Sequence, residues 1–132
     1  EAGAKALILD VRSNGGGTLT AVHKMLDYLL PDTDAEGEER VVVSLTDKRN
    51  NVTQYTCSDE HEVDLPMAVL TNRGTASAAE LFAAALRDCV GAKLGGKDHL
   101  RQGCSSGVGS LKRRLGGEAD LFCFPAAFRQ EL

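Results

Sequence analysis

The sequence predicts an α/β domain built on a mostly buried sheet. Three segments carry this prediction: an apolar run at 4–12, a helix-spaced run at 18–30 and a second strand-turn-helix unit at 65–90. A strand that is covered on both faces reads as a continuous apolar run, as in a parallel sheet. The order strand, turn, helix, hairpin, strand, turn, helix is typical of the α/β class.

Length and composition narrow the range of functions. With 132 residues, 42% hydrophobic and 26% charged, the chain has room for about one domain with a modest core. A net charge of -4 gives no sign of nucleic-acid binding. No apolar run approaches the roughly 20 residues that span a bilayer, and no signal peptide is recognisable. The chain opens at Glu1 directly before a core strand, so we expect a piece of a longer protein.

The first strand is followed by a turn and a helix. The glycines of S-N-G-G-G at 13–17 favour a turn, because glycine adopts backbone angles that other residues resist. Thr18 is suited to cap the next helix, and Pro31 ends it. The apolar positions in between recur at helical spacing. They are Leu19, Val22, Met25, Leu26, Leu29 and Leu30.

Three further elements follow before residue 95. The segment 38–59 predicts two strands around the turn K-R-N-N, and 65–72 predicts a short buried strand. The segment 77–90 is rich in Ala, Leu and Glu, which favour helix. From about residue 95 glycines accumulate and no period of 2 or 3.6 is visible, so no element is predicted there. The four cysteines show no C-x-x-C pair or metal-ligand spacing, so we expect free thiols and no metal.

Ser77 stands at the turn into the second helix, where two interpretations are open. The pattern S-x-x-E that ends at Glu80 is a capping box, in which the hydroxyl only accepts from a helical N–H. Alternatively, Ser77 is a nucleophile beside free backbone N–H groups and the positive end of the helix dipole. Such groups stabilise an oxyanion. Ala78 would supply the first N–H donor, and Gly16 or Gly17 in the earlier turn would supply the second.

Both turns resemble those of the carboxyl-terminal-processing peptidases, also called tail-specific proteases. The first segment, A-L-I-L-D-V-R-S-N-G-G-G, resembles the family's strand and D-L-R-N-N-x-G-G turn. The second, M-A-V-L-T-N-R-G-T-A-S-A-A-E, resembles its strand and [GS]-[ST]-A-S-A-[SA]-E turn before an Ala-rich helix. The likeness covers about residues 1–96. It implies a crotonase/ClpP-like core with a mostly buried sheet flanked by helices, incomplete in this chain.

The resemblance also implies an activity and a site. The activity is endoproteolysis of proteins near their C-termini, outside the cytoplasm (the periplasm or cell-envelope side), without cofactor, metal or nucleic acid. A serine attacks the peptide carbonyl, and water resolves the acyl-enzyme. The matching positions are the nucleophile Ser77, the oxyanion donors Ala78 and Gly16 or Gly17, and the supporting acids Glu80 and Asp88.

The general base of the family is missing from its expected position. The resemblance places a lysine, in the motif [TY]-[FY]-G-K-G, 25 residues after the serine, where this chain has Gln102. A lysine whose pKa is lowered by desolvation can accept the proton, whereas a glutamine amide cannot. We therefore expect little or no peptidase activity from this chain.

Two explanations of Gln102 stay open. Codons for 97–105 can be chosen so that reading one base later gives R-T-T-Y-G-K-G-V, with the lysine at position 102. Residues 97–132 would then be a frameshifted tail outside the family, poorly ordered. If the frame is genuine, the alternative function is a non-catalytic module that holds C-terminal peptides. An acyl-CoA enzyme of the crotonase type is a third and weaker alternative, against which the motif around Ser77 speaks.

Overall fold

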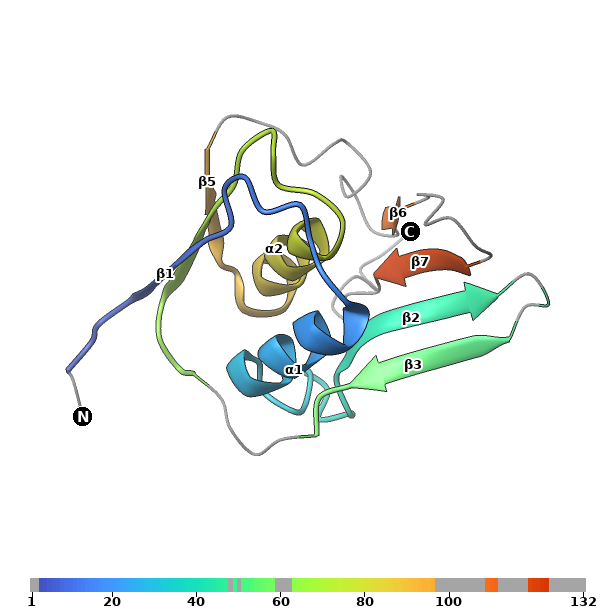
Figure 1. Ribbon diagram of the computed structural model, residues 1–132. Coiled ribbons are helices and arrows are strands. Elements are labelled where there is room, and N and C mark those ends of the chain that lie inside the picture. Colours follow the sequence, from blue (N-terminus) through green and yellow to red (C-terminus); the bar gives the residue numbers. More distant parts are fainter. Residues whose placement is uncertain are drawn as a thin grey trace, which may run out of the picture.

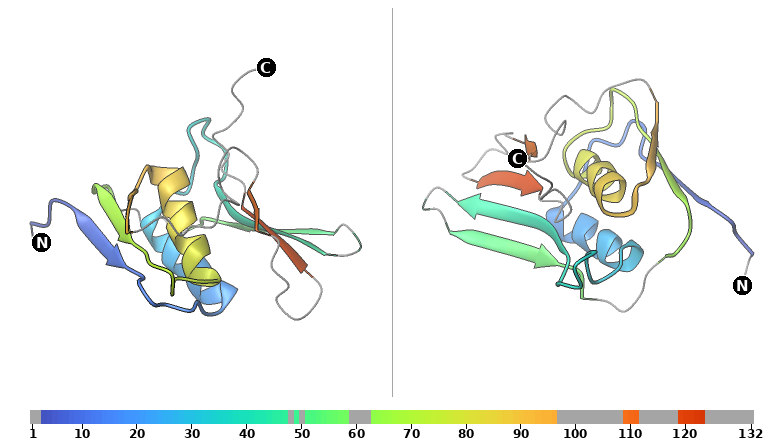
Figure 2. Two further views of the ribbon diagram at one scale, coloured as in Figure 1. Left: turned by 90° about the horizontal axis from the view of Figure 1, so that it is seen from above. Right: turned by 180° about the vertical axis from the view of Figure 1, so that it is seen from behind.

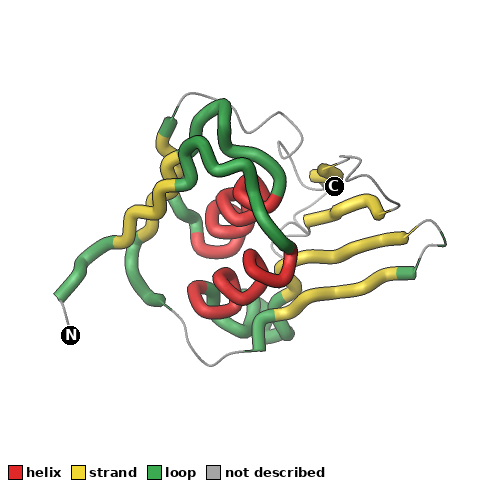
Figure 3. Tube along the Cα trace, viewed as in Figure 1, coloured by secondary structure: helices red, strands yellow, loops and turns green. Residues whose placement is uncertain are grey.

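Two helices lie between two small sheets. The computed structural model describes residues 3–47, 49, 51–58, 63–96, 109–111 and 119–123. Seen from above, both helices separate a parallel sheet from an antiparallel one (Figure 1 and Figure 2, left). Figure 3 shows the same arrangement by element type, with the helices in red at the centre. The α/β class predicted from the sequence is confirmed.

The parallel sheet positions the two loops that carry Gly16 and Ser77. Its strands are β1 (Leu7–Asp10), β4 (Met67–Leu70) and β5 (Lys93–Gly95), in the order β1-β4-β5. The register of β1 and β4 runs from Leu7 opposite Met67 to Asp10 opposite Leu70. Because all three strands are parallel, their carboxyl ends meet at one edge. The loops that follow β1 and β4 therefore start side by side.

Both helices form where the sequence predicts them. Helix α1 (Leu19–Leu29) begins after Thr18, whose hydroxyl accepts from the N–H of Ala21 at 3.2 Å. Helix α2 (Ala78–Val90) ends at Gly91, which adopts the left-handed conformation that glycine tolerates best. Within the described ranges, neither helix has the length and apolar character needed to cross a membrane.

The antiparallel sheet combines the predicted hairpin with two strands that were not predicted. Its strands are β2 (Val41–Asp47), β3 (Val52–Thr56), β6 (Gly109–Leu111) and β7 (Ala119–Cys123), in the order β3-β2-β7-β6. The β2–β3 hairpin is confirmed. Strand β7 pairs with the other edge of β2, although its segment shows no strand period. The division of the chain at residues 96 and 97 stays a prediction.

The prediction that the first strand is buried on both faces is wrong for the described part of the chain. Strand β1 lies at the edge of its sheet, and 67% of Ile8 is exposed. Both helices cover the same face of this sheet (Figure 2, left). The continuous apolar run therefore marks a strand whose second face has no described element packed on it.

The core fills the space between the parallel sheet and the two helices. Leu26 of α1, Leu30 directly after this helix and Leu86 of α2 are completely buried. Val69 of β4 is completely buried as well. Ala83 of α2 is also fully buried, and its small side chain lets the helix pack closely. These contacts fix α2, and with it the turn at the amino end of this helix.

Removing one core side chain should destabilise the whole unit. We expect Leu26→Ala to lower the free energy of unfolding by about 2–5 kcal/mol, because a fully buried leucine leaves a cavity behind. Chemical denaturation followed by circular dichroism measures this loss. Lys24→Ala, at an exposed position of the same helix, should change the stability by no more than about 0.5 kcal/mol. Equal losses in both variants would contradict the described packing of α1.

Candidate active site

The glycine turn after β1 touches the turn that carries Ser77. A Cβ atom added at Gly16 would lie 2.8 Å from the Cβ of Ser77 and 2.9 Å from the backbone N of Ala78. Gly16 also has a φ of +104°, which a side chain would strain. A Cβ at Gly17 would meet nothing within 4 Å. Of the two glycines named as oxyanion donors, the structure thus brings Gly16 against Ser77.

Hydrogen bonds between the two loops hold this contact. The buried hydroxyl of Thr75 donates to the carbonyl of Val11 at 2.8 Å. The N–H of Ala76 donates to the carbonyl of Asn14 at 2.9 Å. Each bond joins residues that are more than 60 positions apart in the sequence. The parallel pairing of β1 with β4 makes both bonds possible, because it starts the two loops at the same edge.

Ser77 has a strained backbone. Its φ of 56° and ψ of −125° lie outside the regions that residues with a side chain ordinarily adopt. Such a conformation costs on the order of 1–3 kcal/mol and is concentrated at functional sites. A sharp strand-to-helix turn of this kind is how the nucleophile elbow of α/β-hydrolases exposes its serine. The strain at Ser77 therefore favours a catalytic role over a purely structural one.

The predicted capping box forms, chiefly through Glu80. The N–H of Ser77 donates to the carboxylate of Glu80 at 2.8 Å. The Ser77 side chain lies toward the backbone N–H of Glu80, as in a capping box, but makes no cap hydrogen bond. That N–H instead donates to the carbonyl of Ser77 at 3.0 Å. Glu80 thus fixes the serine backbone, and the hydroxyl is left available.

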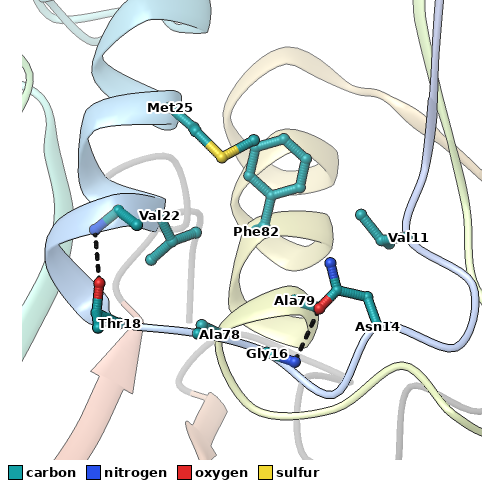
Figure 4. A pocket seen from close by; sticks show the side chains of 11 residues that line it. Val11, Asn14, Gly16, Thr18, Val22, Met25, Ala78, Ala79 and Phe82 are labelled. Carbon is teal, nitrogen blue, oxygen red and sulfur yellow. Dashed lines mark hydrogen bonds between the residues drawn. The ribbon is translucent and has the colours of Figure 1, made fainter.

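The two candidate oxyanion donors differ in their present partners. The N–H of Ala78 has no acceptor within the residues that the structure describes. The N–H of Gly16 donates to the carboxamide oxygen of Asn14 at 2.9 Å (Figure 4). Asn14 is exposed, so this acceptor is not locked by packing. The carbonyl oxygen of a substrate would have to displace the Asn14 carboxamide before it could accept from the N–H of Gly16.

A small apolar cavity lies beside these donors. Its volume is about 180 Å³, and it opens between the amino-terminal parts of α1 and α2 (Figure 4). Met25 of α1 and Phe82 of α2 face one another across it. The cavity also reaches the first turn of each helix and the glycine loop. The remaining lining residues are Val11, Asn14, Gly16, Gly17, Thr18, Ala21, Val22, Ala78 and Ala79.

The second supporting acid, Asp88, does not join this cluster. At a rise of roughly 1.5 Å per residue, Asp88 lies about 16 Å along α2 from Ser77. Its carboxylate is paired with Arg87 at 2.5 Å. Gln102 lies outside the described residues. The strand before it ends close to the site, since Thr71 donates to the carbonyl of Gly95 at 2.8 Å.

The cysteines among the described residues are less suited than Ser77 to act as a nucleophile. Cys57 and Cys89 are both free thiols. Burial raises the pKa of Cys57 to about 12, and burial also raises the pKa of Cys89. A thiol reacts as its thiolate, so neither group is activated at neutral pH.

Sequence reasoning missed the residues that join the two loops. Asn72 and Thr75 take part in most of these hydrogen bonds, and Ser13 donates one to Asn72 and accepts one from it. The only local signal was the polar run T-N-R-G-T directly after an apolar strand. That pattern predicts a turn. It does not identify a partner loop nearly 60 residues away.

Comparison with known proteins gives the family. The model of peptidase family S41 matches residues 1–117, which is 21 residues beyond the boundary predicted from the sequence. A carboxyl-terminal-processing protease of Synechocystis is 36% identical over 103 residues, which are 78% of this chain and 22% of that protein. The carboxy-terminal processing protease CtpB of Bacillus subtilis is 29% identical over 80% of this chain and 22% of its own length.

A solved structure with a similar fold points to the same family. The photosystem II D1 C-terminal processing protease matches 93% of this chain and 29% of its own, with a TM-score of 0.61 and 27% identity. The chain therefore belongs to peptidase family S41. It spans about a fifth of the length of the curated relatives named above.

An exposed ion pair precedes the glycine turn and allows a pH test. The guanidinium of Arg12 donates twice to Asp10, at 2.9 and 2.6 Å. These hydrogen bonds lower the pKa of Asp10 from 3.8 to about 2. Because the folded-state pKa is lowered, the pair's contribution to stability is present above pH 3.8 and is lost as the pH falls through about 2.

We expect Arg12→Ala to return the pKa of Asp10 toward 3.8, because the donated hydrogen bonds are lost. Titration of the side-chain carboxyl carbon by NMR measures the change. Lys5→Ala is the control, at an exposed position before β1, and should leave the pKa of Asp10 low. An unchanged Asp10 pKa in Arg12→Ala would show that the pair does not form in solution.

Proposed function

We propose that this chain carries the nucleophile and oxyanion-binding turns of a serine endopeptidase that processes protein C-termini. The main supporting observation is the contact of Gly16 with the strained turn at Ser77, beside the N–H of Ala78, which has no acceptor among the described residues. Membership of family S41 and the names of the relatives support the same reaction class. We extend the proposal to a crotonase/ClpP-like core, supported by the nucleophile turn that links a parallel strand to α2.

The proposed reaction is acyl transfer. The hydroxyl oxygen of Ser77 attacks the peptide carbonyl carbon, and the electron pair of the carbonyl bond moves onto its oxygen. The N–H groups of Ala78 and Gly16 donate to this oxyanion, once the carboxamide of Asn14 has moved aside. The proton that the Ser77 hydroxyl loses must be taken up by a base, the role of the family's lysine, and passed to the departing amine. Collapse of the intermediate then leaves an acyl-enzyme, which water hydrolyses to a carboxylic acid and free Ser77.

The substrate side chain next to the reacting carbonyl would enter the apolar cavity. The cavity reaches Gly16 and Ala78, so a peptide held by both N–H groups must pass its mouth. Phe82 and Val22 are buried apolar residues of its wall, which favours an uncharged side chain of small or medium size. The proposed substrate is accordingly an extended protein segment with an apolar residue before the cleaved bond.

A second candidate function is peptide binding without cleavage. Gln102 at the position of the family's lysine favours it, since an amide cannot take the proton from Ser77. In that case the cavity and the two turns would hold a peptide, and no acyl-enzyme would form. The two candidates differ in whether Ser77 forms a covalent bond.

A peptide boronic acid separates the two candidates, because boron adds directly to an active serine and needs little help from a general base. We expect the wild-type chain to bind a boronic acid with an apolar terminal side chain at least tenfold more tightly than the matched peptide amide. Ser77→Ala should abolish this preference. Titration calorimetry with both ligands measures it. Equal affinities in the wild-type chain would overturn the peptidase proposal and leave the binding module.

Turnover is a separate expectation for the same chain. We expect cleavage of unstructured protein substrates, followed by mass spectrometry, to stay at the level of Ser77→Ala. Cleavage by the wild-type chain alone would show that a base is present despite Gln102. The nucleotide sequence across codons 90–132, read on an independent template, then decides between a frameshift and a true replacement.

The contact at Gly16 makes a second prediction. Gly16→Ala should lower the affinity for the boronic acid by about 100-fold, because the added methyl group collides with Ser77 and Ala78 and pushes the donor away. Gly15→Ala is the matched control, since a Cβ at Gly15 meets nothing within 4 Å. Its affinity should stay within about threefold of wild type. A similar loss in both variants would point to general disturbance of the loop.

A further inference from the structure

We propose that Asn72 is a positioning residue, which sets the distance between the oxyanion donor Gly16 and the nucleophile Ser77. The inference rests on the proposed function and concerns the same site. Asn72 contacts neither the cavity nor the reacting atoms described above. It acts through the loop that carries Gly16. We call the set formed by Asn72, Thr75 and Ser13 the loop clasp.

The side chain of Asn72 binds the glycine loop at its first residue. Its carboxamide oxygen accepts from the N–H of Ser13 at 2.7 Å and from the N–H of Gly74 at 2.9 Å. Its amide nitrogen donates to the hydroxyl of Ser13 at 3.1 Å. The Asn72 side chain thus hydrogen-bonds both within its own turn and to a residue 59 positions earlier in the chain.

Thr75 completes the loop clasp from the same turn. The N–H of Asn72 donates to the Thr75 hydroxyl oxygen at 3.0 Å, and the N–H of Thr75 donates to the carbonyl of Asn72 at 2.9 Å. The Thr75 hydroxyl in turn donates to Val11. Thr75 therefore fixes the backbone of Asn72, while the side chain of Asn72 binds Ser13. A side chain fixed in this way can transmit a defined position.

Backbone strain at Ser13 shows that the loop does not take this shape unaided. Ser13 has a φ of 58°, which residues with a side chain rarely adopt. The approach is also close, because a Cβ at Gly74 would lie 2.9 Å from the Cα of Ser13. Such conformations persist only where the surroundings impose them. The hydrogen bonds that Asn72 makes with the N–H and the hydroxyl of Ser13 supply that constraint.

The position of the loop clasp explains its effect on the site. Ser13 lies three residues before Gly16, and Asn72 lies five residues before Ser77. Beyond the clasp, the hydrogen bond from the N–H of Ala76 to the carbonyl of Asn14 also joins the two loops. Without Asn72, Ser13 can relax to an ordinary φ, and the turn to Gly16 moves with it. Oxyanion donors must lie within tenths of an ångström of their place, so this shift matters.

The first test reads the position directly. A hydrogen of Gly16 points at the Cβ of Ser77, so the wild-type chain should show a strong NOE between Gly16 Hα and Ser77 Hβ. Asn72→Ala should lose this NOE while the NOEs between β1 and β4 remain. Asn72→Asp, which keeps both acceptor positions for the N–H groups of Ser13 and Gly74, should retain it. An unchanged NOE in folded Asn72→Ala overturns the inference.

The second test reads the consequence for chemistry. We expect Asn72→Ala to reduce the ratio of boronic acid to amide affinity by about tenfold or more, and Asn72→Asp to reduce it less than threefold. A merely structural role would weaken both ligands equally and leave the ratio unchanged, which is the contrary result. If Asn72→Ala does not fold, Gly74→Ala replaces it. Its added methyl group pushes Ser13 away at an exposed position.

Failure of the inference and failure of the proposed function give different results. If the wild-type chain shows no Ser77-dependent preference for the boronic acid, the proposed function falls, and the NOE in Asn72→Ala still decides the positioning role. If the wild-type preference is present and persists in Asn72→Ala, the function stands and the positioning role falls.

Discussion

Parallel pairing of β1 with β4 is the constraint on which the candidate site depends. With Asp10 opposite Leu70, both strands deliver their loops to the same edge of the sheet. An antiparallel pair would have sent the two turns to opposite edges. Strand β5 extends the pattern, because it brings the chain to Gly95 beside Thr71. One edge thus collects the glycine turn, the turn that carries Ser77 and the start of the segment that leads toward Gln102.

At the candidate site, two turns with strained backbones lie next to a well-packed helix. Ser13 and Ser77 both have a positive φ. The N–H of Ser77 donates to the carboxylate of Glu80, three residues later, and the N–H of Ser13 donates to the carboxamide oxygen of Asn72, 59 residues later. The support for this strain is α2, whose inner positions are buried against the parallel sheet. The small side chain of Ala79 at its first turn lets the glycine loop and α1 approach. The packed helix therefore holds in place the two turns that have strained backbones.

The local elements could be predicted because their signals are local. Thr18, the Ala-rich run after Ser77 and the hairpin turn each determine their element from neighbouring residues. The exposed side of β1 could not be predicted, since an apolar run does not tell whether a second layer is present. Strands β6 and β7 lack a period, and β7 depends on the free edge of β2. At the site, Ser77 and the glycine turn could be predicted from turn chemistry and resemblance. Asn72 could not, because its function lies in a partner 59 residues away.

The long sequence separation across the two loops has a consequence for how the molecule acquires its site. Contacts between residues about 60 positions apart form late, because the loop between them must first close at a cost in entropy. A nascent chain that has not yet reached β4 has neither the second strand of the parallel pair nor the turn that carries Ser77. Reactivity at this site would thus emerge as an all-or-none property of the completed tertiary structure. A partly synthesised or misfolded copy of this chain therefore does not assemble the contact between Gly16 and Ser77.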